Sequence, residues 1–243
     1  MKATVVAEIG SNWEGNVTKA KKIIRECKKA GADAVKFQMW RATDLYTKDH
    51  PNWNEIKKSE LSFKITKKLK EYCDKEKIEF FCSAFYPEAV TYLTKIGVKK
   101  FKVASRTCKF IDPYSLEVLE EKNNSKKEIF ISMGMGGNKN KISKIFNKKK
   151  ATFCYCISEY PLKIEKINWN EAKKYDGFSD HTMGILAPIV FTILKNQRQT
   201  NKIYIEKHVK LINSKGPDAS TSITTEQLAE MIKQIRVIEK VKI

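Results

Sequence analysis

Several short apolar runs in this chain end in polar or charged side chains. The first run ends at Glu8, and the later runs end, in chain order, at Lys36 and Gln38, Ser83, Lys102 and Ser105, Ser132, Ser158, Ser179 and His181, and Glu206 and His208. Two lysines with several hydroxyl groups are suited to binding phosphate and carboxylate groups. Two histidines beside a glutamate are suited to a divalent metal with open coordination positions. The pattern therefore predicts an anion site next to a metal site.

The spacing of these residues indicates that they point to a common interior. Lys36 and Gln38 are two residues apart, as are Glu206 and His208, so each pair lies on one side of its strand. Taken singly, these residues have simpler explanations, because a serine at a strand end is often a turn residue and a lone histidine is often a satisfied core group. Lys36 could also extend past the strand to solvent. Recurrence at equivalent positions of eight units favours the functional interpretation.

Eight candidate strands alternate with helical patterns along the chain, which is typical of βαβ units and a parallel sheet. The candidate strands cover residues 4–9, 34–38, 79–83, 100–104, 128–133, 152–157, 177–179 and 203–208. Eight such units predict an α/β fold, a single-domain (β/α)8 TIM barrel over residues 1–243. In this fold the carboxyl ends of the strands hold the active site, which is where the polar residues fall.

The intervening helices are predicted from apolar residues at helical spacing. One stripe consists of Ala20, Ile23, Ile24 and Cys27, and a second consists of Leu61, Ile65, Leu69 and Tyr72. Thr224 and Gln227 have the spacing of a capping box at the start of the last helix. Residues 136–150 offer few apolar anchors, so we expect only a short or irregular element there.

Composition and charge exclude several classes of protein. Hydrophobic residues make up 42% of the 243 residues, which is typical of a globular rather than a disordered chain. The longest nearly apolar run, residues 185–194, is much shorter than the roughly 18 residues that indicate a membrane span, and the N-terminus lacks a secretory pattern. We therefore expect a cytoplasmic protein with no membrane partner. The net charge of +19 comes mainly from lysines on helix faces, without an arginine-rich tail, so we expect no nucleic-acid partner.

The six cysteines do not form the pattern of a disulfide framework. All of them lie in apolar periodic segments and are expected to be reduced core thiols. Cys154 and Cys156 could in principle ligate a soft metal, but residues two apart on a strand share a face and more often simply pack there.

At the residues that end the strands, the chain resembles the N-acetylneuraminate (sialic acid) synthase family. The matching segments, in family order, are AEIGSNWEG (7–15), GADAVKFQ (31–38), FFCSAF (80–85), FKVAS (101–105), ISMGM (131–135), CISEYP (156–161), GFSDHTMGI (177–185), IEKH (205–208) and GPDAS (216–220). SDHT, EKH and GPD after CISEYP are specific as a set. The resemblance implies a barrel enzyme that condenses phosphoenolpyruvate with an N-acetylhexosamine aldehyde of the N-acetylmannosamine type, giving a nonulosonic acid and phosphate.

The resemblance also implies roles for individual residues. His181 and His208 would hold a divalent metal, typically Mn²⁺, with Mg²⁺ or Co²⁺ as alternatives. Residues that would surround phosphoenolpyruvate are Lys36, Ser83, Lys102, Ser105, Ser132, Ser158 and Ser179, with Gln38 and Glu206 also assigned to substrate binding. Tyr160 and Asp218 would contact the sugar. Glu8 would orient or deprotonate the attacking water and, with Lys36 and Lys102, is a candidate catalytic residue.

The chain departs from the family pattern at three points. Asn12 is followed by Trp13 where an Asn-His pair is usual, which would remove a polar group from the sugar end of the site. Ser158 stands where relatives have Asn or Ser, and Thr107 stands where relatives have Glu. The sequence ends at Ile243, soon after the eighth helix, where relatives continue into a small antifreeze-like domain. We therefore expect an open site, a lid supplied by a separate domain, or a catalytic fragment of a longer protein. The resemblance also implies a homodimer.

Other functions remain as alternatives. The chain could be a synthase for a related nonulosonic acid of the legionaminic or pseudaminic type, or a weakly active barrel that binds phosphoenolpyruvate and sugar and needs a separate lid domain. A remote alternative is a basic nucleic-acid-binding protein. Salt dependence distinguishes the last one, because counterion release makes nucleic-acid affinity fall steeply with salt.

Overall fold

The strands form a closed ring of eight parallel strands in the computed structural model, which describes residues 2–146, 151–198 and 200–241. The strands are β1 (Lys2–Glu8), β2 (Ala34–Met39), β3 (Glu79–Ala84), β4 (Lys100–Val103), β5 (Glu128–Ser132), β6 (Ala151–Cys156), β7 (Gly177–Asp180) and β8 (Lys202–Lys210). Each strand pairs with the next in the chain, and β1 pairs with β8 to close the ring. The predicted (β/α)8 barrel is confirmed, and no strand end differs by more than two residues from its predicted position.

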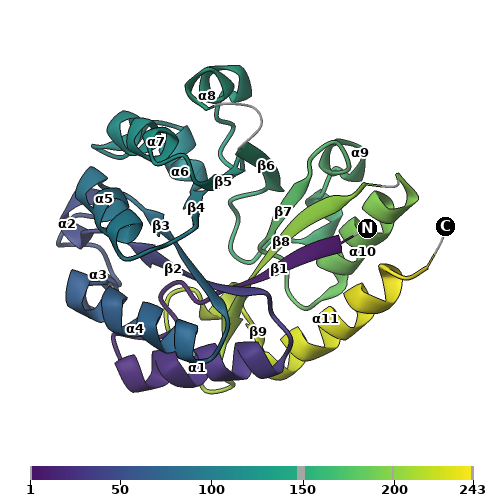
Figure 1. Ribbon diagram of the computed structural model, residues 1–243, viewed down its shortest axis with the longest axis horizontal. Coiled ribbons are helices and arrows are strands. Elements are labelled where there is room, and N and C mark those ends of the chain that lie inside the picture. Colours follow the sequence, from purple (N-terminus) through teal and green to yellow (C-terminus); the bar gives the residue numbers. More distant parts are fainter. Residues whose placement is uncertain (1, 147–150, 199, 242–243) are drawn as a thin grey trace.

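Helices surround the ring of strands (Figure 1). The helices that follow successive strands are α1 (Val17–Lys29), α4 (Phe63–Lys75), α5 (Pro87–Lys95), α7 (Ser115–Asn124), α8 (Lys139–Ile145), α9 (Trp169–Ala172), α10 (Leu186–Gln197) and α11 (Thr225–Ile238). The loops carry the short elements α2 (Ala42–Leu45), α3 (Trp53–Lys58), α6 (Ser105–Cys108), η1 (Ile164–Lys166), η2 (Ala219–Thr221) and β9 (Ile223–Thr224). The short element expected after β5 is α8, and residues 147–150 of that interval lie outside the described residues.

Local sequence signals account for where these helices begin and which face they bury. The four residues of the first predicted stripe are the buried residues of α1. The capping box of α11 is present: Thr224 Oγ1 accepts from Gln227 N at 3.3 Å, and Gln227 Oε1 accepts from Thr224 N at 2.9 Å. The second predicted stripe also faces the core, because Leu61 and Leu69 are buried and Ile65 and Tyr72 are partly buried against them. Helix α4 buries Thr66, Leu69 and Cys73, and the Thr66 hydroxyl tolerates burial because it donates to Ser62 O at 2.9 Å.

An aromatic layer fills the interior of the barrel. Phe81, Phe130 and Tyr204 are buried there, with ring centroids 6.1 Å apart for Phe81 and Phe130 and 4.1 Å apart for Phe130 and Tyr204. Each ring lies two residues before a polar residue on the same strand, and residues two apart share a side. The aromatic layer is therefore the floor beneath the polar residues at the carboxyl ends of the strands.

Two further predictions from the sequence concern the state of the cysteines and the absence of a membrane span. All six cysteines are free and buried, as the sequence predicted. Within the described part of the chain, no helix is both long enough and apolar enough to cross a bilayer.

Candidate active site

A cavity of about 480 Å³ opens at the carboxyl ends of the barrel strands. The predicted site residues that line it are Lys36, Gln38, Ser83, Lys102, Ser105, Ser132, Ser158, Tyr160, His181, Glu206, His208 and Asp218. Glu8 and Ser179 do not line the cavity, but each contacts one of its two lysines. The barrel thus brings together every residue that the sequence assigned to the site.

The parallel register explains why residues so far apart in sequence meet. Glu8 on β1 is in register with Lys36 on β2 and with His208 on β8. Ser83 on β3 is likewise in register with Lys102 on β4, and Ser179 on β7 with Glu206 on β8. Because neighbouring strands end at the same rim, polar residues at their ends face one interior.

The first lysine of the cavity is held by two carboxylates and a hydroxyl. Lys36 Nζ forms an ion pair with Glu8, lies 3.1 Å from Ser83 Oγ and lies 3.8 Å from Glu206 Oε2. Burial raises the pKa of Glu8 to about 7, although the Lys36 charge lowers it. Gln38 Nε2 donates to Glu8 Oε1 at 3.0 Å. Glu8 can therefore gain or lose a proton near neutral pH, with its carboxyl group fixed on both sides.

The second lysine has a more complete set of partners. Lys102 Nζ lies 2.7 Å from Ser132 Oγ, 3.0 Å from Ser179 Oγ and 2.9 Å from Glu206 Oε1. Burial acts to lower the pKa of Lys102, but the Glu206 carboxylate together with Cys154 and Cys156 raises it overall. Burial also acts to raise the pKa of Glu206, yet Lys102 and Lys36 bring it down to about 2. Both groups are therefore charged at neutral pH, and an anion that enters the cavity competes with Glu206 for the lysines.

The two histidines lie side by side at the mouth of the cavity, with ring centroids 5.4 Å apart. His181 Nδ1 bonds to Ile157 O at 2.7 Å, so Nδ1 carries the proton and Nε2 is left as a free ligand atom. His208 Nδ1 is buried and has no partner among the described residues. Burial lowers the pKa of His208 to about 3, which keeps that ring neutral. Burial acts to lower the pKa of His181, but Cys156 and the Ile157 carbonyl raise it overall, so a metal that binds there would displace a proton from that ring. With one nitrogen of each ring then available, the pair fits a divalent metal.

The histidines would not complete a metal site alone. Among the residues that the structure describes, no group of three or more His, Cys, Asp or Glu side chains is placed to hold an ion. Catalytic metals usually have three protein ligands, so a metal held by His181 and His208 alone would need water or substrate to complete its coordination.

Two glycines allow the backbone to approach the site closely. At Gly10, which has a φ of +51°, an added Cβ would lie 2.4 Å from Asp218 Oδ2 and 3.2 Å from Glu8 Oε1. At Gly134, an added Cβ would lie 2.8 Å from Ser158 Oγ. Side chains at these positions would displace predicted site residues, which explains glycine in both motifs.

Asp218 and Tyr160 lie on the outer side of the cavity. Asp218 Oδ2 accepts from Ser11 N and from Ser11 Oγ, each at 2.7 Å, which fixes the carboxylate across the rim. The Tyr160 ring is 52% exposed, and its centroid lies 4.1 Å from that of His181. This side of the site is the one at which a second substrate could enter.

Some cavity residues were not found from the sequence. Cys156 lines the cavity, and its Sγ lies 3.9 Å from His181 Nδ1, so its interpretation as a core thiol was incomplete. Its register with Ser179 was the available signal. Tyr46 and Arg106 also line the cavity from loops, where strand patterns give no guidance. Trp13 is buried in the hydrophobic core and does not line the cavity.

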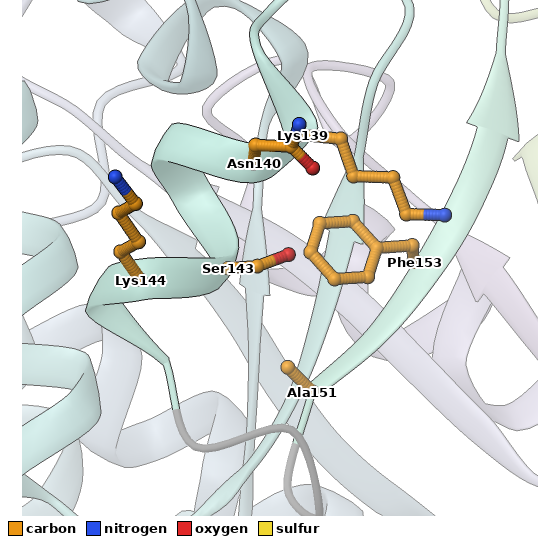
Figure 2. Close-up of a pocket in the computed structure, with 6 residues that line it drawn as sticks. All are labelled: Lys139, Asn140, Ser143, Lys144, Ala151 and Phe153. Atoms are coloured by element: carbon orange, nitrogen blue, oxygen red, sulfur yellow. The ribbon is translucent and has the colours of Figure 1, made fainter.

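A second hollow lies away from these residues, between α8 and β6 (Figure 2). Figure 2 shows Lys139, Asn140 and Ser143 on the helix side that faces Phe153 of the strand, whereas the Lys144 side chain points away from the strand. The Lys139 ammonium lies 5.0 Å from the Phe153 ring centroid. None of the predicted site residues contributes to this hollow.

Comparisons with known proteins find relatives over nearly the whole chain. The model of the NeuB family matches residues 23–242. An uncharacterized protein of Methanocaldococcus jannaschii is 34% identical over 97% of this chain and 71% of its own length. The N,N'-diacetyllegionaminic acid synthase of Campylobacter jejuni is 30% identical over 98% of this chain and 77% of its own.

A solved structure of a related enzyme has the same fold. The N-acetylneuraminic acid (sialic acid) synthetase of Leptospira borgpetersenii superposes with a TM-score of 0.86 at 28% identity, covering 98% of this chain and 84% of that one.

Proposed function

Because the chain belongs to the NeuB family, we propose that it condenses phosphoenolpyruvate with an N-acetylhexosamine aldehyde of the N-acetylmannosamine type in a metal-dependent reaction. The products would be a nonulosonic acid and phosphate. The chain is a carbon–carbon bond-forming synthase, as its named relatives are acid synthases. The observation that carries the finer proposal is that Lys36, Lys102 and the His181–His208 pair line one cavity.

The floor of the cavity is suited to phosphoenolpyruvate. Lys36 and Lys102 are both buried, and hydroxyl groups of Ser83, Ser132 and Ser179 lie within 3.1 Å of their ammonium groups. Charge-assisted bonds from such donors bind phosphate and carboxylate oxygens. The aromatic layer below excludes water, which strengthens these interactions because the effective dielectric constant is lower. Tyr204 donates to Glu206 Oε2, so Glu206 keeps a partner when the substrate takes the lysines.

A divalent metal fits the upper part of the site. His181 and His208 would hold it, and Mn²⁺ is the proposed ion, with Mg²⁺ and Co²⁺ as alternatives. When bound, the ion would supply a Lewis acid that polarises the sugar aldehyde.

The protein residues account for the remaining steps. C3 of phosphoenolpyruvate would attack the aldehyde carbon, leaving positive charge at C2. Water would add to C2, with Glu8 accepting a proton from it, because burial raises the pKa of this carboxyl group to about 7 while Lys36 and Gln38 hold it in place. Collapse of the tetrahedral intermediate would break the bond from C2 to the phosphate oxygen. Lys36 and Lys102 would stabilise the departing phosphate, and they are already in place before the reaction.

Exposed apolar side chains at the rim of the barrel are relevant to the oligomeric state. The loops after β4, β5, β7 and β8 and the first turn of α10 expose large apolar side chains, namely Ile111, Met135, Met183, Leu186 and Ile212. Exposed apolar residues that gather on one face favour a protein partner there. We propose that a second copy of the chain covers this face in a homodimer. Sedimentation of the wild type and of Met183→Ser would test this, and a wild type that is monomeric at working concentration would contradict it.

The proposed function is tested by phosphate release from phosphoenolpyruvate with a panel of N-acylated hexosamines, with and without Mn²⁺. We expect metal-dependent release with at least one acceptor, and the mass of the product separates a neuraminic from a legionaminic or pseudaminic acid. Release without an acceptor sugar would indicate a phosphatase instead. Binding of duplex DNA that weakens steeply with salt, in the absence of phosphate release, would favour the nucleic-acid alternative.

A further inference from the structure

The ammonium group of Lys102 has an acceptor for each of its hydrogen-bond donors. A lysine ammonium can donate three hydrogen bonds. Lys102 Nζ lies 2.7 Å from Ser132 Oγ, 3.0 Å from Ser179 Oγ and 2.9 Å from Glu206 Oε1. A phosphate or carboxylate group that binds to this lysine must therefore replace one of these three acceptors.

Glu206 is the acceptor that an incoming anion can replace with the least loss. The hydroxyl groups of Ser132 and Ser179 bond to each other at 2.9 Å, and a hydroxyl group can also turn to donate to an anion. A carboxylate can only accept, so Glu206 cannot bond to an anion and repels it. Exchange of one anionic group for another leaves the charge beside Lys102 nearly unchanged. The anion therefore takes the place of Glu206.

The carboxylate of Glu206 acts on both lysines of the cavity. Its Oε1 contacts Lys102, and its Oε2 lies 3.8 Å from Lys36 Nζ. All three side chains are buried and line the cavity, so water screens these charges only weakly. An anion that binds the lysines must first break the ion pair with Glu206, which lowers its affinity.

Tyr204 gives Glu206 a partner that does not depend on the lysines. The two residues are two apart on β8 and share a side of the strand, and the Tyr204 hydroxyl donates to Glu206 Oε2. The Tyr204 ring is only 1% exposed and stacks on Phe130 at an interplanar angle of 21°, which fixes the position of its hydroxyl. A Glu206 carboxylate that moves off Lys102 therefore stays tethered beside it and can return.

We propose that Glu206 is an internal competitor that promotes release of the phosphate product, and that Tyr204 is the residue that positions it. Phosphoenolpyruvate displaces Glu206 from Lys102 because its carboxylate and its phosphate bind together. Once the bond from C2 to the phosphate oxygen breaks, the phosphate binds alone and loses this advantage. Glu206 then returns to Lys102, and the phosphate leaves. This inference rests on the proposed function, because it requires phosphate to be formed in the cavity.

Two variants with opposite expected effects test the proposal by calorimetric titration with inorganic phosphate at constant ionic strength. Glu206→Gln keeps the shape and removes the competing charge, so phosphate should bind about tenfold more tightly or better. Tyr204→Phe keeps the ring and removes the tether, so Glu206 rests on the lysines alone and phosphate should bind about two- to tenfold more weakly. Glu88→Gln, an exposed carboxylate outside the cavity, is the control for net charge and should leave the affinity unchanged.

Turnover kinetics test the role in product release. In Glu206→Gln we expect KM for phosphoenolpyruvate and kcat to fall together, and rapid quenching should show a burst of phosphate in the first turnover, because release becomes slower than chemistry. Weaker phosphate binding in both variants would indicate a merely structural role and overturn the proposal, as would the absence of a burst in Glu206→Gln. Opposite shifts in phosphate affinity without turnover of any acceptor would support competition by Glu206 and contradict the proposed function.

Discussion

Lys207 and Asp180 form a fully buried ion pair, with Nζ 2.7 Å from Oδ2, and each immediately precedes one of the two histidines of the cavity. Because side chains alternate along a strand, this pair lies on the opposite side of β7 and β8 from the cavity. Asp180 also accepts from Thr182 N at 2.9 Å and from Thr182 Oγ1 at 3.0 Å. The ion pair therefore ties together the two strand ends that carry the proposed metal ligands.

Breaking this ion pair should weaken metal binding without touching the ligands. In Asp180→Asn, we expect Mn²⁺ affinity to fall by about 10- to 100-fold, as is usual when groups that orient metal ligands are removed. The unpaired Lys207 should also cost about 3–5 kcal/mol of unfolding free energy. Calorimetric titration with Mn²⁺ and urea unfolding measure the two effects. The double variant Asp180→Asn with Lys207→Met should regain stability but not metal affinity, and recovery of both would contradict the positioning role.

Replacing the proposed ligands should affect the metal more directly. We expect His181→Ala and His208→Ala each to abolish metal-dependent turnover, while the melting temperature changes little, because rim residues contribute less to the core than to the site. Turnover assays after dialysis against a chelator and after addition of Mn²⁺ check this. Full activity of the wild type after metal removal would exclude the metal assignment.

Lys102→Ala should weaken binding of phosphoenolpyruvate far more than binding of the sugar. The variant loses a charge-assisted contact worth about 1.5–3 kcal/mol, or roughly 10- to 150-fold in affinity. In the wild type the Lys102 ammonium lies 2.9 Å from the Glu206 carboxylate. Without this ammonium, the negative charge of Glu206 is less compensated and repels the anionic substrate. Separate titrations with the two substrates measure the split, and equal losses for both would contradict the role of Lys102.

The raised pKa of Glu8 predicts a pH dependence of stability. Burial raises this pKa from 4.5 to about 7, so the folded protein binds a proton that the unfolded chain releases. The contribution to stability is fully present below about pH 4.5 and is lost as the pH rises to about 7, by about 3 kcal/mol in total. Urea unfolding between pH 4.5 and pH 7.5 should show this loss in the wild type and a flatter profile in Glu8→Gln. Identical slopes for the two proteins would contradict the shift.

The same carboxyl group predicts a pH dependence of catalysis. If Glu8 accepts the proton of the attacking water, kcat at saturating substrates should rise with pH as Glu8 ionises, and Glu8→Gln should be slow at every pH. A rise in kcat that persists with unchanged midpoint in Glu8→Gln would assign the base to another group.

The barrel and most of its site followed from the sequence because one rule connects them. Polar residues at the ends of eight apolar runs, such as Lys36, Ser83 and Lys102, must face one rim once the strands close into a ring. Tyr204 was not predicted, because a tyrosine in a strand pattern is ordinarily a packing residue and only the closed barrel places its hydroxyl on Glu206. The loop residues that line the cavity were missed because loops carry no periodic signal.

Lys122 shows most clearly what the sequence could not indicate. It lies in a polar helix segment that predicts exposure, yet it is fully buried on α7. Its Nζ donates to Ala84 O and to Lys102 O, each at 2.9 Å. Strands β3 and β4 are in register only at Cys82 with Phe101 and at Ser83 with Lys102. The lysine thus continues the bonding between these two strands where the backbone ladder stops.

Lys122→Met therefore provides the last prediction, because methionine keeps most of the volume and removes the donors. Two buried carbonyl groups would lose their partner, so we expect the free energy of unfolding to fall by about 1–3 kcal/mol. Ser83 and Lys102 project into the cavity from the loosened strand ends, so affinity for phosphoenolpyruvate should fall by about two- to tenfold while sugar affinity is kept. Lys195→Met is the matched control, since Lys195 is also buried but pairs with Asp176, ahead of β7 and at the other end of the barrel. That control should lose stability and keep its affinity for phosphoenolpyruvate, whereas parallel losses in both variants would show that Lys122 contributes to stability alone.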